Sequence, residues 1–153
     1  MNGLFTTRRA LLTALGGAGA LLVVRPATAT PETMKEAIRK ITGGTAMKPG
    51  RIKLELPPLV ENGNTVAMTV AVESPMSAKD YVKAIHVATE KNPQPNVISA
   101  TLGPRAGKAE IQTRIRLADT QTVIAIAEMS DGSFWSDQVN VIITLGACLE
   151  DPV

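Results

Sequence analysis

The chain has 153 residues, of which 44% are hydrophobic, 20% are charged and only 3% are aromatic, with one cysteine and one histidine. Three of its 16 lysines and arginines lie in the first 29 residues, and all 14 acidic residues lie after them, so the remainder has 13 basic and 14 acidic residues and a net charge of −1. This balance excludes binding of nucleic acid through a broad basic surface. The remaining length of about 124 residues suits one domain rather than two.

The first 29 residues have the pattern of a twin-arginine signal peptide. The adjacent Arg8 and Arg9 precede an apolar run of about 15 residues, at positions 10–24, which leads to an Ala-x-Ala ending at Ala29. Such a run is shorter than the 18 or more residues of a membrane-spanning helix. We therefore expect export by the twin-arginine route, cleavage after Ala29, and a periplasmic protein that is free of the membrane after signal removal. A membrane anchor that stays attached is the alternative.

Residues 30–44 predict an amphipathic helix. Thr30 suits the N-cap position, Pro31 suits the first helical position, and Gly43 suits the end. The apolar residues at helical spacing are Met34, Ala37, Ile38 and Ile41. Because one face is apolar, we expect the helix to pack against the rest of the domain.

After Gly50 the hydrophobic period changes from 3.6 to 2, which predicts β-strands. We expect strands at 52–56, 66–72, 81–89, 97–102, 111–117, 122–129 and 139–145, separated by turns rich in Gly, Pro, Asn and Asp. About seven short strands indicate an all-β, immunoglobulin-like antiparallel sandwich with an N-terminal helix. The predicted organisation is a signal peptide at 1–29, the sandwich domain with its helix at 30–145, and a C-terminal tail at 146–153.

The largest apolar pair, Phe134 and Trp135, follows the Asp131-Gly132 turn. These two side chains either close the hydrophobic core or form an interface with a second subunit. We favour the core.

Two further groups are candidate sites. His86 falls in an expected strand, on the same parity as Val82, Ala84 and Ala88. It has no nucleophile or additional metal ligands near it in the sequence, so we interpret it as a hydrogen-bonded or half-exposed strand residue. Arg114 and Arg116 share one expected strand face with Gln112, which is either an anion site or a solvated face. The solvated face is the default for alternating charge on such a strand. We expect neither a metal site nor a catalytic residue.

The only cysteine, Cys148, lies five residues from the C-terminus. It follows the last expected strand by three residues, a reach of at most roughly 10 Å along an extended chain. A single cysteine is unusual in an exported protein, because an oxidising compartment pairs or modifies it. Gly146 and Ala147 have no bulky side chains and suit a slender stalk. The spacing leaves open both an inert thiol and a reactive one.

Four stretches of the chain match one known family. They are ENGNTVAMTVAVESPM, VKAIHVATEKNPQPNV, LGPRAGKAEIQTRIRLADTQTVIAIAEMSDGSFW and the terminal Gly146-x-Cys148. Over nearly its whole length after the signal, the chain resembles SoxY, the sulfur-carrier subunit of the periplasmic thiosulfate-oxidising Sox system. The resemblance implies an immunoglobulin-like sandwich, twin-arginine export, and a heterodimer with a SoxZ-like subunit.

The resemblance further implies that Cys148 holds the substrate covalently, as a cysteine S-thiosulfonate or a persulfide. The chain would then have no other cofactor and no enzymatic activity of its own. Partner proteins, namely a c-type cytochrome, a hydrolase and a sulfur dehydrogenase, would act on the bound sulfur in turn. A tethered thiol suits this role because it forms and releases S–S bonds reversibly and stays at high effective concentration near each enzyme.

The tail departs from the family pattern. The family's usual ending is Gly-Gly-Cys-Gly-Gly, whereas Cys148 is followed here by Leu-Glu-Asp-Pro-Val. A divergent SoxY-like partner or sensor subunit without carrier activity is therefore an alternative hypothesis. A thiol enzyme that uses Cys148 directly is a third, and it lacks an accompanying base or anion hole in the sequence.

Overall fold

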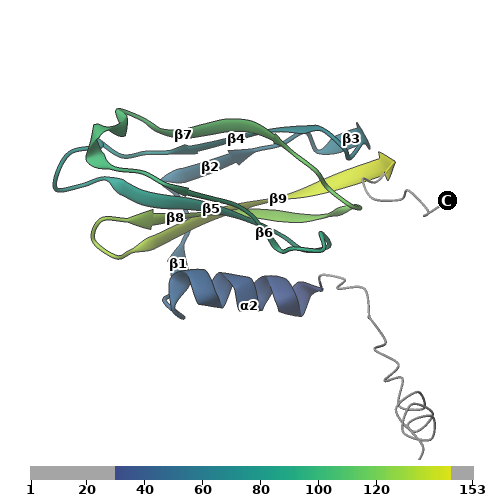
Figure 1. The fold of residues 1–153 in the computed structure, drawn as a ribbon, viewed down its shortest axis with the longest axis horizontal. Coiled ribbons are helices and arrows are strands. Elements are labelled where there is room, and N and C mark those ends of the chain that lie inside the picture. The colour runs from purple at the N-terminus through teal and green to yellow at the C-terminus, as the bar shows by residue number, and fades with distance from the viewer. Residues whose placement is uncertain (1–29, 146–153) are drawn as a thin grey trace, which may run out of the picture.

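The computed structural model describes residues 30–145, which form three layers, one helix and two β-sheets (Figure 1). The helix lies against one sheet, and the second sheet lies on the far side of the first (Figure 1). In chain order the elements are α2 (Pro31–Thr42), β1 (Met47–Lys48), β2 (Ile52–Glu55), β3 (Leu59–Asn62), β4 (Val66–Val72), β5 (Val82–Thr89), β6 (Asn96–Thr101), the 3-10 helix η1 (Pro104–Ala106), β7 (Ala109–Ile115), β8 (Gln121–Met129) and β9 (Phe134–Leu145).

The two sheets confirm the predicted immunoglobulin-like sandwich. The larger sheet has the order β1-β9-β8-β5-β6, with β3 also paired to β9, and the smaller sheet has the order β2-β4-β7. The long strands pair antiparallel with one another, whereas the short β1 and β3 pair parallel with β9. Strands β1 and β3 are not among the predicted strands, because β1 has only two residues and the four residues of β3, Leu-Val-Glu-Asn, do not alternate.

One edge of the sandwich crosses from sheet to sheet at the Pro57-Pro58 pair. Strand β2 pairs with β4 in the smaller sheet, and β3, which begins directly after the prolines, pairs with β9 in the larger sheet. Proline has no N–H to donate to a sheet and therefore suits a crossing of this kind. The Pro58 carbonyl still accepts a hydrogen bond of 2.9 Å from the Ile142 N–H, which attaches the crossing to β9.

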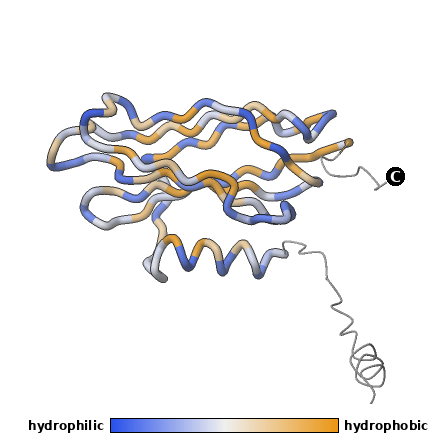
Figure 2. Tube along the Cα trace, viewed as in Figure 1, coloured by the Kyte–Doolittle hydropathy of each residue, from blue (hydrophilic) through white to orange (hydrophobic). Residues whose placement is uncertain are grey.

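The main core lies between the two sheets and is aliphatic. Its largest fully buried members include Met68, Ile85, Leu117 and Met129. The alternating burial of β4 places every second residue in this layer, as the period of 2 predicts, whereas β8 is buried on both faces. Figure 2 shows the hydrophobic colour concentrated along the strands, with hydrophilic residues at the turns.

Helix α2 begins and ends close to its predicted limits. Thr30 caps it: the Thr30 side chain accepts from the Thr33 N–H, and the Thr33 Oγ1 accepts from the Thr30 N–H at 2.7 Å. Gly43 ends the helix in the left-handed conformation, with φ 61°. Within residues 30–145 no helix combines the length and the apolar character that crossing a bilayer requires.

The apolar face of α2 packs on the outer face of the larger sheet, which confirms the predicted docking. Met34, Ile38 and Ile41 contact a second hydrophobic cluster. The sheet residues of this cluster are Ala88, Ile124, Ile126 and Phe134. The sheet is therefore covered on both faces where the helix lies.

Phe134 and Trp135 begin strand β9, five residues before its predicted start. Successive strand residues point to opposite faces, so Phe134 enters the helix–sheet cluster and Trp135 packs against the main core. Phe134 is 7% exposed. The interpretation that this pair closes the core is confirmed, with one side chain in each of two hydrophobic layers.

Candidate functional site

The predicted attachment residue, Cys148, and its stalk, Gly146 and Ala147, lie outside the described residues, as do Arg8 and Arg9 of the predicted signal. The structure describes the base from which the C-terminal segment continues. This base is the end of β9 at Leu145, three residues before Cys148 in the chain.

The end of β9 is tied to three other segments of the chain. The Leu145 carbonyl accepts a hydrogen bond of 2.8 Å from the Gly63 N–H, and the Gly63 carbonyl accepts one of 2.8 Å from the Leu117 N–H. The Thr144 hydroxyl donates to the Glu61 carbonyl at 3.1 Å. The Ile143 N–H donates to Thr120 Oγ1 at 2.9 Å. The last residues of β9 are therefore held by β3, by the turn after it, and by the segment between β7 and β8.

A buried amide network stabilises the same end of the sandwich. Asn92 Nδ2 donates to the Arg116 carbonyl at 2.8 Å, and Asn92 Oδ1 accepts from the Ala118 N–H and from Gln121 Nε2, each at 3.0 Å. Gln121 Oε1 accepts in turn from the Lys91 N–H at 2.7 Å. Because Asn92 and Gln121 are both buried, these bonds replace water for every amide involved.

This network is not evident from the sequence. Asn92 lies in a predicted turn, where an asparagine is usually exposed. Its partner Gln121 lies 29 positions away along the chain. The only sequence signal is a glutamine at the first position of an apolar strand, which is too common to single out.

The single histidine lies on the outer, helix-side face of the larger sheet. An irregularity in the pairing between Val82 and Ala84 breaks the simple alternation, so Val82 enters the main core while His86 shares its face with Ala88. The predicted shared face is therefore wrong for Val82 and confirmed for Ala88. His86 Nδ1 lies 2.9 Å from Ser99 Oγ. Burial lowers the pKa of His86, and the nearby Glu128 carboxylate opposes this shift.

The interpretation of His86 as a hydrogen-bonded, half-exposed strand residue is confirmed. Across residues 30–145 no three His, Cys, Asp or Glu side chains are grouped so that they could hold a metal ion.

The two candidate arginines do not converge. Arg114 lines an open groove of about 750 Å³ on the outer face of the smaller sheet, together with Glu55, Thr69 and Gln112. Arg116 lies beyond the end of β7 and lines a separate hollow with Asn92 and Val97. The sequence predicts Arg114 and Arg116 on one face, which requires that the strand include both residues. Strand β7 ends at Ile115, so Arg116 does not belong to it. The solvated-face interpretation agrees with this arrangement better than an anion site does.

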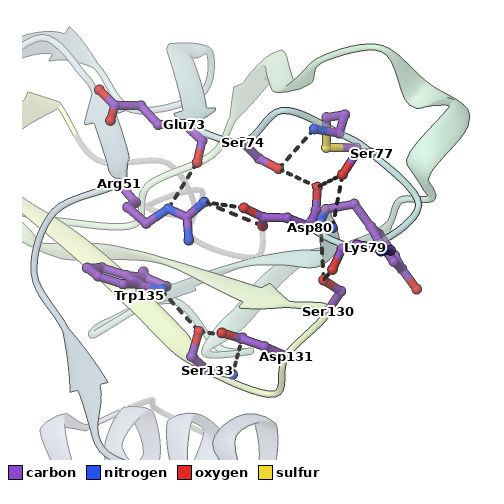
Figure 3. Close-up of polar contacts among 12 residues, drawn as sticks. Arg51, Glu73, Ser74, Ser77, Lys79, Asp80, Ser130, Asp131, Ser133 and Trp135 are labelled. Carbon is purple, nitrogen blue, oxygen red and sulfur yellow. Dashed lines mark hydrogen bonds and ion pairs between the residues drawn. The ribbon is translucent and has the colours of Figure 1, made fainter.

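A polar cluster occupies the opposite end of the sandwich, where β9 begins (Figure 3). Arg51 Nη2 lies 3.3 Å from Asp80 Oδ2, and the Arg51 guanidinium lies 5.7 Å from the centre of the Trp135 ring. Trp135 Nε1 donates to Ser133 Oγ at 3.2 Å, and Ser133 Oγ donates to Asp131 at 2.6 Å. These groups satisfy one another and connect the loops before β2, β5 and β9, so the cluster has a structural role.

The fold and its end geometry define an immunoglobulin-like sandwich whose longest strand leads directly into a cysteine-bearing C-terminal segment. The family described as sulfur oxidation protein SoxY matches residues 38–148, well over half of the chain. The chain therefore belongs to the SoxY family. The resemblance drawn from its sequence is confirmed.

Solved structures agree with this assignment. The chain is similar to the sulfur carrier protein SoxY from Chlorobium limicola f thiosulfatophilum, with 26% identity and a TM-score of 0.63, covering 74% of this chain and 98% of that one. The superoxide reductase (neelaredoxin) from Ignicoccus hospitalis has 15% identity and a TM-score of 0.55, over 61% of this chain and 80% of that one. A putative superoxide reductase from Thermotoga maritima has 17% identity and a TM-score of 0.54, over 63% and 93%. At these identities the two reductases share the fold alone. No curated protein matches the chain.

Proposed function

We propose that the protein is a covalent carrier of sulfur intermediates in thiosulfate oxidation, with Cys148 as the attachment site and Gly146 and Ala147 as its stalk. The observation that carries this proposal is the extent of the family match, which runs from residue 38 to Cys148 itself. SoxY is a sulfur carrier rather than an enzyme, and the similar structure from Chlorobium limicola is described as a sulfur carrier protein. Family membership also implies a periplasmic location and a partner within the Sox system, such as SoxZ.

The proposed carrier cycle uses one sulfur atom of the protein, that of Cys148. Joining the Cys148 thiolate to the outer sulfur of thiosulfate forms one S–S bond and releases two electrons, which a c-type cytochrome partner takes up. Hydrolysis of the resulting S-thiosulfonate by a hydrolase partner consumes water, releases sulfate and leaves a persulfide on Cys148. A sulfur dehydrogenase partner then takes six electrons from the outer sulfur, which gains three oxygen atoms from water and becomes an S-sulfonate on Cys148. Hydrolysis of the S–S bond of this group consumes water, releases a second sulfate and returns the Cys148 thiol. The carrier supplies attachment and release, because S–S bonds form and break reversibly.

The described part of the chain supports a presenting role. The end of β9 is held by hydrogen bonds with Gly63, Thr120 and Glu61, so the base of the tail has a defined position. A reactive group on a short segment beyond such a base stays at high effective concentration for any enzyme that contacts the base. We propose that a SoxZ-like subunit forms a heterodimer with this chain, and that the chain reaches the periplasm by the twin-arginine route with cleavage after Ala29.

Intact-mass spectrometry tests the carrier function. Protein isolated from cells growing on thiosulfate is expected to carry a thiosulfonate or persulfide adduct, which tandem spectrometry assigns to Cys148. The Cys148→Ser variant, purified in the same way, is the control and is expected to carry none. Wild-type protein that remains unmodified during active thiosulfate oxidation would refute the proposal.

A second candidate function is a SoxY-like partner or sensor subunit without carrier activity. The observation that favours it is the ending Leu-Glu-Asp-Pro-Val, which replaces the glycines of the usual family tail with bulkier and acidic residues. This alternative predicts that cells with Cys148→Ala oxidise thiosulfate at the wild-type rate. The carrier function predicts that they do not.

A further inference from the structure

The hollow that Arg116 lines lies between the turn joining β5 to β6 and the segment that follows β7. Its volume is about 270 Å³. Among the described residues that line it, Arg116 alone is charged, and three side-chain amides supply further hydrogen-bond donors, those of Asn92, Gln94 and Asn96. The rest of the lining is apolar and includes Val97 and Ala118. A hollow of this composition suits a carboxylate that is followed by small apolar side chains.

The charge of Arg116 is not neutralised by another described residue. Within residues 30–145 Arg116 forms no ion pair, whereas Lys91, next to Asn92 in the chain, is paired with Asp119 at 2.8 Å. The groove that Arg114 lines contains Glu55. A carboxylate that entered that groove would meet a like charge, and one that entered the Arg116 hollow would not.

Hydrogen bonds fix the two sides of the hollow relative to each other. Asn92 Nδ2 donates to the Arg116 carbonyl at 2.8 Å, and Asn92 Oδ1 accepts from the Ala118 N–H at 3.0 Å. The turn before β6 is thus joined to the segment after β7. Because the hollow is formed in advance, a group that binds there costs little ordering of the domain.

The end of β9 lies within reach of this hollow. The Leu145 carbonyl accepts from the Gly63 N–H, and the Gly63 carbonyl accepts from the Leu117 N–H, both at 2.8 Å. Backbones joined by such bonds lie about 5–6 Å apart, so the Cα of Arg116 lies within roughly 15 Å of that of Leu145. Glu150 follows Leu145 by five residues, a span of up to roughly 17 Å along an extended chain.

The residues after Cys148 complement the hollow in charge and in side-chain type. Glu150 and Asp151 are acidic, and Pro152 and Val153 are small and apolar. This acidic stretch is the part of the sequence that departs from the usual glycine ending of the family. The family match itself ends at residue 148.

We propose that residues 150–153 bind in the Arg116 hollow, with the carboxylate of Glu150 or Asp151 against the guanidinium. A single exposed ion pair is weak, but the short tether supplies the carboxylate at an effective concentration of roughly millimolar order. The acidic stretch therefore exchanges between a bound and a free position, and salt favours the free one.

Binding of residues 150–153 would act on the thiol as well. When the stretch is bound, the chain is held on both sides of Cys148, at Leu145 and at the hollow. A partner protein then has to displace the acidic stretch before it takes up the thiol. The contact itself involves no sulfur chemistry, so it does not depend on the carrier function proposed above.

Carbodiimide coupling in the purified protein tests the contact, because this reagent joins an amine to a carboxylate that touches it. Arg116→Lys keeps the positive charge and supplies the amine. Arg114→Lys is the matched control, since Arg114 is also exposed and lies two residues earlier, at the other groove. Coupling removes one water from the intact mass, and tandem mass spectrometry identifies the joined residues.

We expect the Arg116→Lys variant to couple to Glu150 or Asp151 of the same chain, with a yield at least about fivefold above that of Arg114→Lys. In 1 M NaCl this yield is expected to fall by about half or more, because salt screens exposed charges.

Nuclear magnetic resonance gives a second readout in which Arg116 is unchanged. Glu150→Gln with Asp151→Asn removes the two negative charges and keeps the size of both side chains. This double variant is expected to shift the resonances of the Ala118 amide and the Gln94 side-chain amide, which both line the hollow. The amide of Thr69, at the other groove, is expected to stay in place.

Equal coupling of the two lysine variants to the acidic stretch would overturn the inference, and so would unmoved resonances of Ala118 and Gln94. Coupling found only between two chains would overturn it as well, because the hollow would then receive the acidic stretch of a second copy. None of these results bears on the carrier function, which fails separately if Cys148 carries no adduct in cells that oxidise thiosulfate.

Discussion

The Arg51 guanidinium lies between the Asp80 carboxylate, at 3.3 Å, and the face of the Trp135 ring, at 5.7 Å (Figure 3). Arg51 Nε also donates to the Glu73 carbonyl at 3.2 Å. The Arg51 side chain thus joins the loops before β2 and β5 to the start of β9. Arg51 makes three of these contacts, and the Asp80 carboxylate takes part in one of them, so the two residues are expected to contribute unequally to stability.

The first prediction concerns that inequality. Asp80→Ala removes one ion pair between partly exposed groups, so it is expected to lower the free energy of unfolding by about 0.5 kcal/mol. Arg51→Ala removes the ion pair, the bond to the Glu73 carbonyl and the ring contact, and is expected to cost about 1–2 kcal/mol. Urea unfolding of both variants measures the difference. Because salt screens the ion pair, 1 M NaCl should reduce the effect of Asp80→Ala more than that of Arg51→Ala. Equal costs for the two variants would contradict the assigned role of Trp135.

The second prediction concerns the docking of α2. Phe134→Ala opens a cavity between helix and sheet and is expected to cost about 3 kcal/mol, and Ile38→Ala about 1–2 kcal/mol. Because the two side chains share one cluster, the double variant is expected to lose less than the sum of the single losses. Lys40→Ala, on the exposed face of the same helix, is the control and should change stability little. Strict additivity would mean that Ile38 and Phe134 do not share a cluster.

The third prediction concerns the amide network near the end of β9. Asn92→Ala leaves the Ala118 N–H and the Arg116 carbonyl buried without their partner, at a cost of about 2–3 kcal/mol. Gln94→Ala, at an exposed position of the same turn, is expected to cost less than about 0.5 kcal/mol. Thermal unfolding of the two variants checks this contrast. A similar melting temperature for both would show that the network does not stabilise the domain.

The fourth prediction concerns pH. Burial lowers the pKa of His86 below 6.5, so the unfolded chain binds a proton more readily than the folded one. The His86 contribution is therefore present above pH 6.5 and is lost as the pH falls through the folded-state pKa. The pKa values of Asp119 and Asp131 are lowered from 3.8 by hydrogen bonds, from Lys91 and Ser133 respectively, so their contributions are lost only in more acidic solution.

Urea unfolding between pH 7.5 and pH 5 therefore isolates the histidine. Wild type is expected to lose stability over this range, and His86→Gln is expected to show a flatter profile. Parallel profiles for the two proteins would assign the pH dependence to other groups.

The sequence by itself determined the local elements of this protein. The helix could be predicted because its cap, its apolar spacing and its terminal Gly43 all lie within one short segment. The longer strands could be predicted because alternation over six or more residues is visible without knowing their partners. The matched stretches ending in Gly146-x-Cys148 indicated the family, which the match over residues 38–148 confirms. The roles of Cys148 and of the twin-arginine pair remain predictions.

Only the tertiary structure decided which distant residues meet. The parallel pairing of β3 with β9, the irregularity that moves His86 to the helix side, and the contact of Asn92 with Gln121 all join segments far apart in the chain. The exposed pair Leu59 and Ile142 arises in the same way, because Leu59 lies outside every predicted strand and its pairing with Ile142 joins distant segments. Residue propensity and hydrophobic periodicity report on a few neighbouring residues of the chain. The register of strand pairs, the crossing between sheets and the surface left uncovered depend on how whole strands pack.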